Sequence, residues 1–228
     1  MFARRADALE RIANEFASAR VATYATYAGD VRDAESLAAA GADFIARYGA
    51  PDIVIANAGV SRGTSTEHAE DAQAFRAVFD TNVLGIVHTF QPFVGAMKAA
   101  HRGALVGIAS IAGFRGIAGS GAYSASKAAA ITYLESLRLE LAGSGVAVVT
   151  VCPGYIATPM TAQNPYRMPF LLDAGKAARL IARAIERRRR FYVLPWPMAI
   201  VGRLLRALPR PLYDAVFARA PRKPRVSS

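Results

Sequence analysis

The sequence predicts an α/β protein built on a doubly wound parallel sheet, and three observations support this prediction. Short apolar segments alternate with segments of helical periodicity along most of the chain. The apolar segments lack the polar alternation of half-exposed strands, as expected for strands buried on both faces of a parallel sheet. The 228 residues, 53% hydrophobic and 20% charged, suffice for one domain with a buried core.

The elements are expected in alternating order. Helices are predicted at residues 7–18, 33–48, 71–100, 122–141 and 173–188. Strands are predicted at residues 21–26, 52–56, 104–109, 146–151 and 191–194. The longest predicted loops lie at residues 110–121 and 153–172. We therefore expect one domain over residues 1–195, incomplete at its N-terminus, followed by a basic, amphipathic helical tail over residues 196–228.

The net charge of +11 is concentrated at the C-terminal end of the chain. Residues 176–228 hold 14 basic and two acidic residues, whereas residues 1–175 hold 14 basic and 15 acidic residues. The single cysteine, Cys152, excludes an intramolecular disulfide, and the sequence contains no secretory signal and no apolar run long enough to span a membrane. We expect a cytoplasmic protein without a metal site, because the three histidines lack ligand-like spacing.

A tyrosine and a lysine, Tyr123 and Lys127, lie four residues apart in a predicted helix and so share one face. A nearby ammonium favours the phenolate and lowers the pKa of a tyrosine, which suits proton exchange with an alcohol or a ketone. Alone, such a pair is weak evidence, because both residue types are common on helices.

Further motifs accompany this pair, each at or near the end of a predicted element. They are Asn57-Ala58-Gly59, Asn82, Ser110 and Pro153-Gly154. Each one has an ordinary alternative role as a turn, a cap or a loop hydroxyl, but their combination and order are specific. The combination resembles the short-chain dehydrogenase/reductase family over about residues 3–195, which implies a Rossmann-like fold.

The resemblance implies a catalytic set of Ser110, Tyr123, Lys127 and Asn82. In this set Tyr123 exchanges a proton with the carbonyl oxygen and Ser110 stabilises that oxygen. Lys127 tunes Tyr123 and binds the nicotinamide ribose, and Asn82 anchors a water of the proton relay. The cofactor-binding residues implied by the family are Arg4, Asp30, Val31, Asn57, Ala58, Gly59, Tyr123, Lys127, Pro153, Gly154, Ile156 and Thr158.

The choice of cofactor follows from the first residues of the chain. Ala3-Arg4-Arg5 stands where the family selects its nucleotide, and no acidic residue precedes Asp7. An arginine can pair with the 2′-phosphate, so NADP(H) is expected rather than NAD(H). The alternative is that these arginines are a solvated helix start.

One family feature is missing from this sequence. No Gly-rich turn precedes Asn57, and roughly 30 residues of strand, turn and helix that would cradle the pyrophosphate are absent. That first strand is central in the family's sheet. Its loss is expected to leave a gap, to draw the neighbouring strands together or to recruit a strand from another chain. Either the sequence starts inside a longer coding sequence, or it is a genuine shortened member.

The basic tail leaves three roles open. Its apolar positions are Met198, Ile200, Val201, Leu204, Leu205, Leu208, Leu212, Tyr213, Val216 and Phe217, interspersed with arginines. Such a stripe is typical of a lid over the substrate pocket or of a subunit interface. We favour these two roles over the second candidate, a peripheral contact with an anionic membrane. Nucleic acid is the third candidate, but no motif supports it, and we expect no nucleic-acid partner.

We expect an oxidoreductase that moves a hydride between NADP(H) and a ketone or secondary alcohol. The substrate is expected to be a small, apolar carbonyl/alcohol molecule, and the protein is expected to be a homo-oligomer. The alternative is a catalytically impaired member that acts by binding or oligomerising. An in-frame Gly-rich turn upstream of Met1 would favour the enzyme.

The first prediction concerns the missing phosphate cradle. The 228-residue chain is expected to bind NADPH poorly, and an N-terminally extended chain is expected to restore binding. Titration of NADPH fluorescence against both chains measures this difference. Micromolar binding by the 228-residue chain would contradict the prediction.

Overall fold

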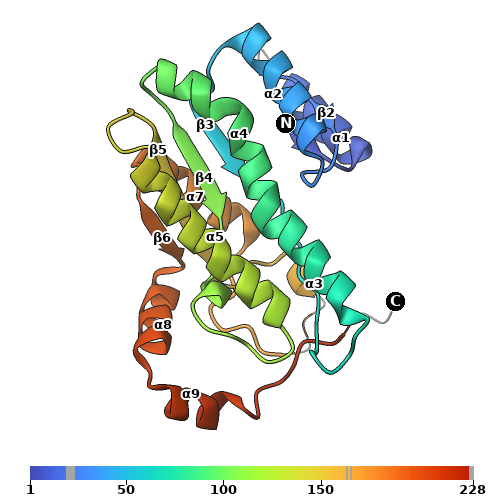
Figure 1. Ribbon diagram of the computed structural model, residues 1–228, viewed down its shortest axis with the longest axis vertical. Helices are drawn as coiled ribbons and strands as arrows, with labels where there is room; N and C mark the ends of the chain where they lie inside the picture. Colours follow the sequence, from blue (N-terminus) through green and yellow to red (C-terminus); the bar gives the residue numbers. More distant parts are fainter. Residues whose placement is uncertain (19–23, 163, 165, 226–228) are drawn as a thin grey trace.

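The computed structural model describes residues 1–18, 24–162, 164 and 166–225. In this part of the chain, four parallel strands form the main sheet (Figure 1). Their order is β3 (Ile53–Ala56), β4 (Ala104–Ile108), β5 (Ala147–Pro153) and β6 (Phe191–Leu194). Two further strands, β1 (Phe2–Ala3) and β2 (Tyr27–Ala28), form a separate parallel pair. The predicted doubly wound α/β architecture is confirmed.

The two sheets are not joined by strand pairing among the described residues. Strand β3 pairs only with β4, and β1 pairs only with β2. Ile53 and Ile55, on the edge strand β3, remain about half exposed as a result. Among the described residues the neighbouring strands do not close up, and β1 and β3 stay unpaired with a gap between them. Recruitment of a strand from another chain stays a prediction.

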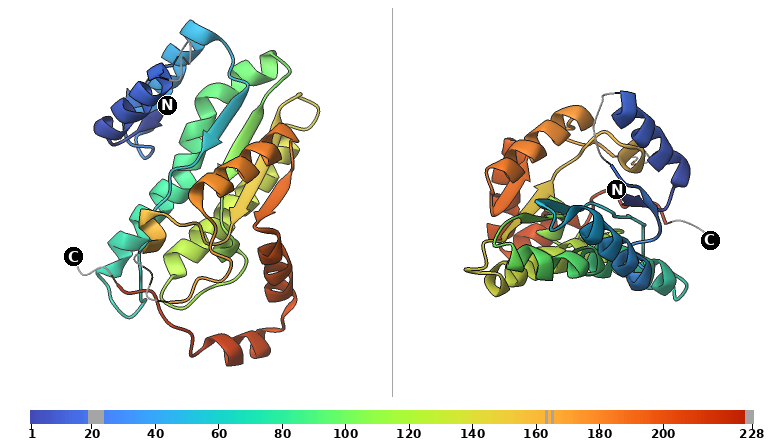
Figure 2. Two further views of the ribbon diagram at one scale, coloured as in Figure 1. Left: turned by 180° about the vertical axis from the view of Figure 1, so that it is seen from behind. Right: turned by 90° about the horizontal axis from the view of Figure 1, so that it is seen from above.

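Helices cover both faces of the main sheet. The helices of the described residues are α1 (Ala6–Ser18), α2 (Ala34–Tyr48), α3 (Asp71–Phe79), α4 (Gly85–Ala99), α5 (Gly121–Glu140), α6 (Pro159–Ala162), α7 (Ala174–Glu186), α8 (Trp196–Ala207) and α9 (Arg210–Phe217). Helices α4 and α5 lie on one face and α7 on the other (Figure 2). Asp33 and Asp173 cap α2 and α7, because each side chain accepts the N–H of the residue three positions later.

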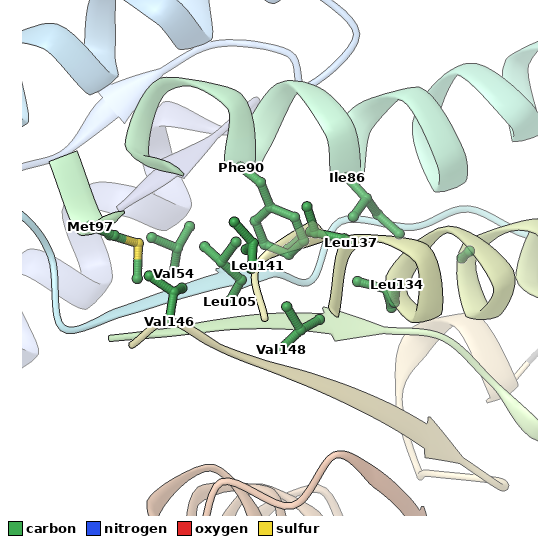
Figure 3. Packing of buried hydrophobic residues seen from close by; sticks show 12 residues of the cluster. Val54, Ile86, Phe90, Met97, Leu105, Leu134, Leu137, Leu141, Val146 and Val148 are labelled. Carbon is green, nitrogen blue, oxygen red and sulfur yellow. The ribbon is translucent and has the colours of Figure 1, made fainter. Parts of the chain in front are cut away.

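The core has one apolar cluster on each face of the sheet. On the first face, Phe90 of α4 and Leu134 of α5 pack onto Val54 and Leu105 of the strands (Figure 3). On the second face, Val149 and other strand residues pack against α7. The near-continuous apolar strands of the sequence therefore face a helix layer on both sides.

Three sequence predictions need correction. The strand predicted at 21–26 lies partly outside the described residues, and residues 24–26 are not in a strand. Pairing with β1 begins at Tyr27, whose N–H donates to the Met1 carbonyl over 2.8 Å. The helix predicted at 71–100 contains a π-helical turn, η1 (Asp80–Leu84). The loop predicted at 153–172 contains the short helix α6. The periodicity of apolar side chains cannot reveal the one added residue of a π-helical turn or a helix of a single turn, so the sequence predicts neither η1 nor α6.

The helices of the tail are confirmed as α8 and α9. No helix in the described part of the chain is both long and apolar enough to cross a bilayer.

The second prediction tests the first core cluster. Phe90 is fully buried, so Phe90→Ala is expected to lower the free energy of unfolding by about 3–5 kcal/mol through lost burial and a residual cavity. Urea unfolding followed by circular dichroism measures the loss. Phe75→Ala is the matched control, because Phe75 is partly exposed on α3 and its loss should cost less than about 1 kcal/mol. Equal losses in both variants would contradict this account of the core.

Candidate active site

The predicted catalytic pair, Tyr123 and Lys127, lies on the first turns of α5, beside the carboxyl ends of β4 and β5. The Lys127 ammonium nitrogen is 5.8 Å from the centre of the Tyr123 ring. The predicted one-turn relation between the two side chains is therefore present. In an open parallel sheet this is the edge at which ligands bind.

Lys127 is buried, with 4% of its surface exposed. Its Nζ donates a hydrogen bond of 2.8 Å to the Ile108 carbonyl at the end of β4. Burial disfavours the ammonium and lowers the pKa of Lys127 to about 8. The lysine is thus still mainly charged at neutral pH, but it loses its proton more readily than an exposed lysine.

Tyr123 departs from the expectation drawn from the sequence. Burial raises the pKa of its phenol, and only the neighbouring Ser110 hydroxyl acts in the opposite direction. The expected lowering of the pKa by Lys127 is not found, because the ammonium is hydrogen-bonded to Ile108 and not to the phenol. In this structure Tyr123 is a protonated phenol at neutral pH, which is the form that donates a proton.

Ser110 follows β4 and caps the short 3₁₀ turn η2 (Ile111–Gly113). Its Oγ accepts the Ala112 N–H over 3.1 Å and donates to the Pro153 carbonyl over 3.4 Å. The hydroxyl is buried and held between the ends of β4 and β5. This placement brings Ser110 to the same sheet edge as Tyr123, as predicted.

Asn82 connects three parts of the site. The side chain is fully buried and projects from the π-helical turn η1. Its Oδ1 accepts the Val60 N–H over 2.8 Å, and its Nδ2 donates to the Val60 carbonyl over 2.9 Å and to Ser126 Oγ over 3.0 Å. The amide therefore joins the loop after β3 to the catalytic helix α5.

Gly59 lies where this loop passes closest to the lysine. A Cβ at this position would stand 3.4 Å from Asn82 Oδ1 and 3.5 Å from Lys127 Nζ. Any longer side chain would crowd the ammonium, so glycine keeps the space in front of Lys127 clear. Asn57 and Ala58, which precede it, are exposed at the end of β3.

The segment after β5 forms another wall of the site. The Gly154 N–H donates to the Leu194 carbonyl over 2.7 Å, and Ile156 pairs with Leu172. The Thr158 N–H donates to Thr161 Oγ1 over 3.0 Å and leads into α6. The predicted positions Pro153, Gly154, Ile156 and Thr158 thus belong to one tethered segment beside Ser110.

The remaining predicted residues follow the two strands of the small sheet. Asp30 pairs with Arg32 over 2.7 Å, which lowers the pKa of its carboxyl, and Arg4 stands 4.0 Å away. Val31 lies against Gly85 at the start of α4, and its carbonyl is 2.9 Å from His88 Nδ1. The small sheet is therefore attached to α4, while Arg4 stays exposed at the end of β1.

Sequence reasoning missed two parts of this region. Ser126 links Asn82 to the Tyr123 carbonyl, to which its Oγ donates over 2.8 Å, and its place between the catalytic pair was the available signal. The end of the chain was also missed. Arg225 makes a two-pronged ion pair with Asp71, at 2.9 and 3.0 Å, and Lys223 Nζ lies 2.6 Å from Ser61 Oγ. No local pattern signals contacts over such sequence separations.

Cys152 is fully buried in β5, and burial raises the pKa of its thiol to about 12. A protonated, enclosed thiol behaves as a small apolar side chain.

The donor set fits the nicotinamide half of a dinucleotide. An ammonium has three N–H donors, and in the described part of the chain Lys127 gives one to Ile108. Gly59 keeps the approach to that ammonium open, and Ser110 and Tyr123 supply hydroxyl groups at the same edge. The described residues offer no Gly-rich backbone turn before β3 to hold a pyrophosphate.

A serine, a tyrosine and a buried lysine thus meet at the carboxyl edge of a parallel α/β sheet, where ligands bind in such folds. The sequence model described as short chain dehydrogenase matches residues 1–168. The chain belongs to the short-chain dehydrogenase/reductase family and is an NAD(P)-dependent oxidoreductase by membership.

Two curated relatives illustrate this membership. A protein of Myxococcus xanthus described as an uncharacterized oxidoreductase is 42% identical over 174 residues, which are 76% of this chain and 68% of that protein. A cis-4-hydroxycyclohexanecarboxylate dehydrogenase of Sinomonas cyclohexanicum is 34% identical over 157 residues, which are 69% of this chain and 63% of that protein. The chain thus spans only part of the length of these relatives.

Two solved structures share the fold. A short-chain dehydrogenase of Burkholderia cenocepacia in complex with NADP matches with a TM-score of 0.73 and 27% identity, covering 86% of this chain and 78% of that one. An alcohol dehydrogenase of Thermococcus sibiricus, complexed with 5-hydroxy-NADP, matches with a TM-score of 0.74 and 25% identity, covering 85% of this chain and 82% of that one.

The third prediction concerns Lys127. Because burial disfavours the ammonium, Lys127 is expected to titrate near pH 8 in the cofactor-free protein. Nuclear magnetic resonance of carbon-13-labelled lysine follows the Cε shift with pH, and loss of the signal in Lys127→Met assigns it. Titration at the ordinary lysine value of about 10.4 would show that the ammonium is solvated instead.

Proposed function

We propose that this protein is an NADP(H)-dependent oxidoreductase of an apolar ketone or secondary-alcohol substrate. The placement of Ser110, Tyr123 and Lys127 at one sheet edge carries the proposal. When bound, the nicotinamide ring supplies or accepts the hydride. The residues of this chain orient the substrate oxygen and handle the proton.

The proton is handled at the Tyr123 hydroxyl. Because the pKa of Tyr123 is raised, the phenol is protonated at neutral pH and donates its proton to the oxygen of a ketone as that oxygen gains negative charge. The Ser110 hydroxyl has one proton, which turns from the long 3.4 Å bond to the Pro153 carbonyl to donate a second hydrogen bond to the same oxygen. The Lys127 ammonium lies one turn further along the same helix, with N–H groups free of the Ile108 bond to bind the nicotinamide ribose. Asn82 holds the loop after β3 against α5.

This arrangement favours reduction at neutral pH. Oxidation of an alcohol needs Tyr123 as a base, and the raised pKa of its phenol keeps that form scarce until the pH rises. Relatives described as ketoacyl reductases and as an acetoacetyl-CoA reductase support a carbonyl substrate. The dehydrogenase of Sinomonas cyclohexanicum supports the secondary-alcohol class.

The preference for NADP(H) over NAD(H) rests on Arg4. Arg32 occupies the carboxylate of Asp30 at 2.7 Å, whereas Arg4 stays 4.0 Å away with its side chain exposed. The Arg4 guanidinium can therefore turn to a 2′-phosphate without leaving the Asp30 carboxylate unpaired. Three solved structures that share the fold are described with NADP or 5-hydroxy-NADP.

We also propose a homo-oligomer in the cytoplasm, with a helical tail that reaches a membrane surface from one side. Support for the oligomer comes from exposed apolar side chains on the helical layer, Phe75, Leu84 and Leu139. The tail over residues 196–228 is proposed as a unit separate from the domain over residues 1–195.

A second candidate function is a catalytically impaired protein that acts by binding or oligomerising. The gap between the sheet containing β1 and the sheet containing β3 favours it, because a dinucleotide binds across that part of such a sheet.

The fourth prediction separates the two candidates. With NADPH and a panel of apolar ketones, Tyr123→Phe is expected to lower kcat about 10²–10⁴-fold by removing the proton donor. Ser110→Ala is expected to lower kcat about 10²-fold by removing an oxyanion donor. Oxidation of NADPH is followed by absorbance, with the N-terminally extended chain as the parent.

Tyr133→Phe is the matched control, because Tyr133 lies on the same helix within the first core cluster. Its turnover should equal that of the parent. If the extended chain binds NADPH but reduces none of the ketones of the panel, the second candidate function, a catalytically impaired binding protein, is favoured over the oxidoreductase.

A further inference from the structure

Helix α8 has an apolar face that the domain does not cover. On its inner face Met198 and Gly202 are buried. On its outer face Trp196, Ile200 and Leu204, spaced four residues apart, are 74%, 47% and 65% exposed. Helix α9 repeats the pattern, since Leu212 and Val216 are exposed while the Tyr213 hydroxyl donates to the Gly116 carbonyl over 2.7 Å.

The inner contacts hold this apolar face outward. A Cβ at Gly202 would lie 2.5 Å from the Phe114 ring, so the ring lies directly on the backbone of α8. The Arg115 guanidinium lies 4.5 Å from the centre of the Tyr213 ring and donates to the Leu208 carbonyl over 2.6 Å. Because both helices are tethered by their inner faces, the exposed residues cannot be buried by a simple rotation of either helix.

The surroundings of this face are strongly basic. Residues 196–225 contain seven basic residues and one acid, Asp214. Within the part of the chain that the structure describes, Arg225 is the one basic residue of this segment in an ion pair. Arg203, Arg210 and Arg219 are exposed on or next to these two helices. The face thus combines apolar side chains with uncompensated positive charge.

We infer that the outer face of α8 and α9, defined by Trp196, Ile200, Leu204, Leu212 and Val216, docks onto an anionic lipid bilayer. Such a surface accepts apolar side chains at its acyl boundary and pairs arginines with its phosphates. A second copy of this chain would bring the same positive charge against itself, which opposes docking. A nucleic-acid backbone would pair the arginines but would leave Ile200 and Leu204 exposed to water.

The docking face borders the proposed active site. Met198, on the inner side of α8, would contact a Cβ at Gly154, and Phe114 belongs to the loop that follows Ser110. Figure 1 shows α8 and α9 along the rim below the carboxyl ends of β5 and β6. Resting on the proposed function, a bilayer at this face would deliver an apolar ketone that partitions into lipid.

Vesicle binding of the full chain tests the inference without cofactor or substrate, so its outcome is independent of turnover. The probes are vesicles of phosphatidylcholine and vesicles in which a third of the lipid is phosphatidylglycerol. Trp196 is the only tryptophan, so its emission reports directly on this face. We expect flotation with the anionic vesicles, a blue shift of the emission, and binding at least about tenfold weaker to the neutral vesicles.

Ile200→Ser combined with Leu204→Ser should weaken binding to anionic vesicles about tenfold or more, because both side chains are exposed and contribute to insertion and not to folding. Leu139→Ser is the matched control, since Leu139 is 70% exposed on α5 and lies outside the docking face. Failure to float with anionic vesicles would overturn the inference. So would a blue shift without vesicles that grows with protein concentration, which would show that a second copy covers the face.

Discussion

The burial of Lys127 against the end of β4 is the interaction on which the rest of the site depends. An ammonium in an apolar interior is unfavourable unless a neighbouring group accepts a hydrogen bond from it, and the Ile108 carbonyl does so over 2.8 Å. This bond ties the second turn of α5 to the end of β4. Tyr123 lies one turn earlier on the same helix, beside Ser110.

The π-helical turn between α3 and α4 serves the same end. In a regular α-helix, successive side chains are rotated by about 100° around the helix axis. The added residue of a π-helical turn changes the direction of the side chains locally. The inward Asn82 amide then satisfies both backbone groups of Val60 and reaches Ser126. Three segments that are far apart in the sequence are thereby held at one point, which Gly59 keeps uncrowded.

The C-terminal segment after α9 contacts the domain near the candidate active site. After α9 the chain passes along the loops next to the site, where Lys223 contacts Ser61 and Arg225 pairs with Asp71 at the start of α3. The charge of the tail is therefore used in two ways. Its last basic residues hold the chain on the domain, while those of α8 and α9 remain on the outer surface.

The sequence by itself determined the order of the elements, the two-sided burial of the strands and the family motif. These properties follow from local periodicity and from residues a few positions apart, such as Tyr123 and Lys127. Only the tertiary structure decided the small sheet at Tyr27–Ala28, the gap beside β3, the π turn under Asn82 and the attachment of the tail. The direction of the Tyr123 pKa was decided there as well, because burial and hydrogen-bond partners are set by contacts between distant segments.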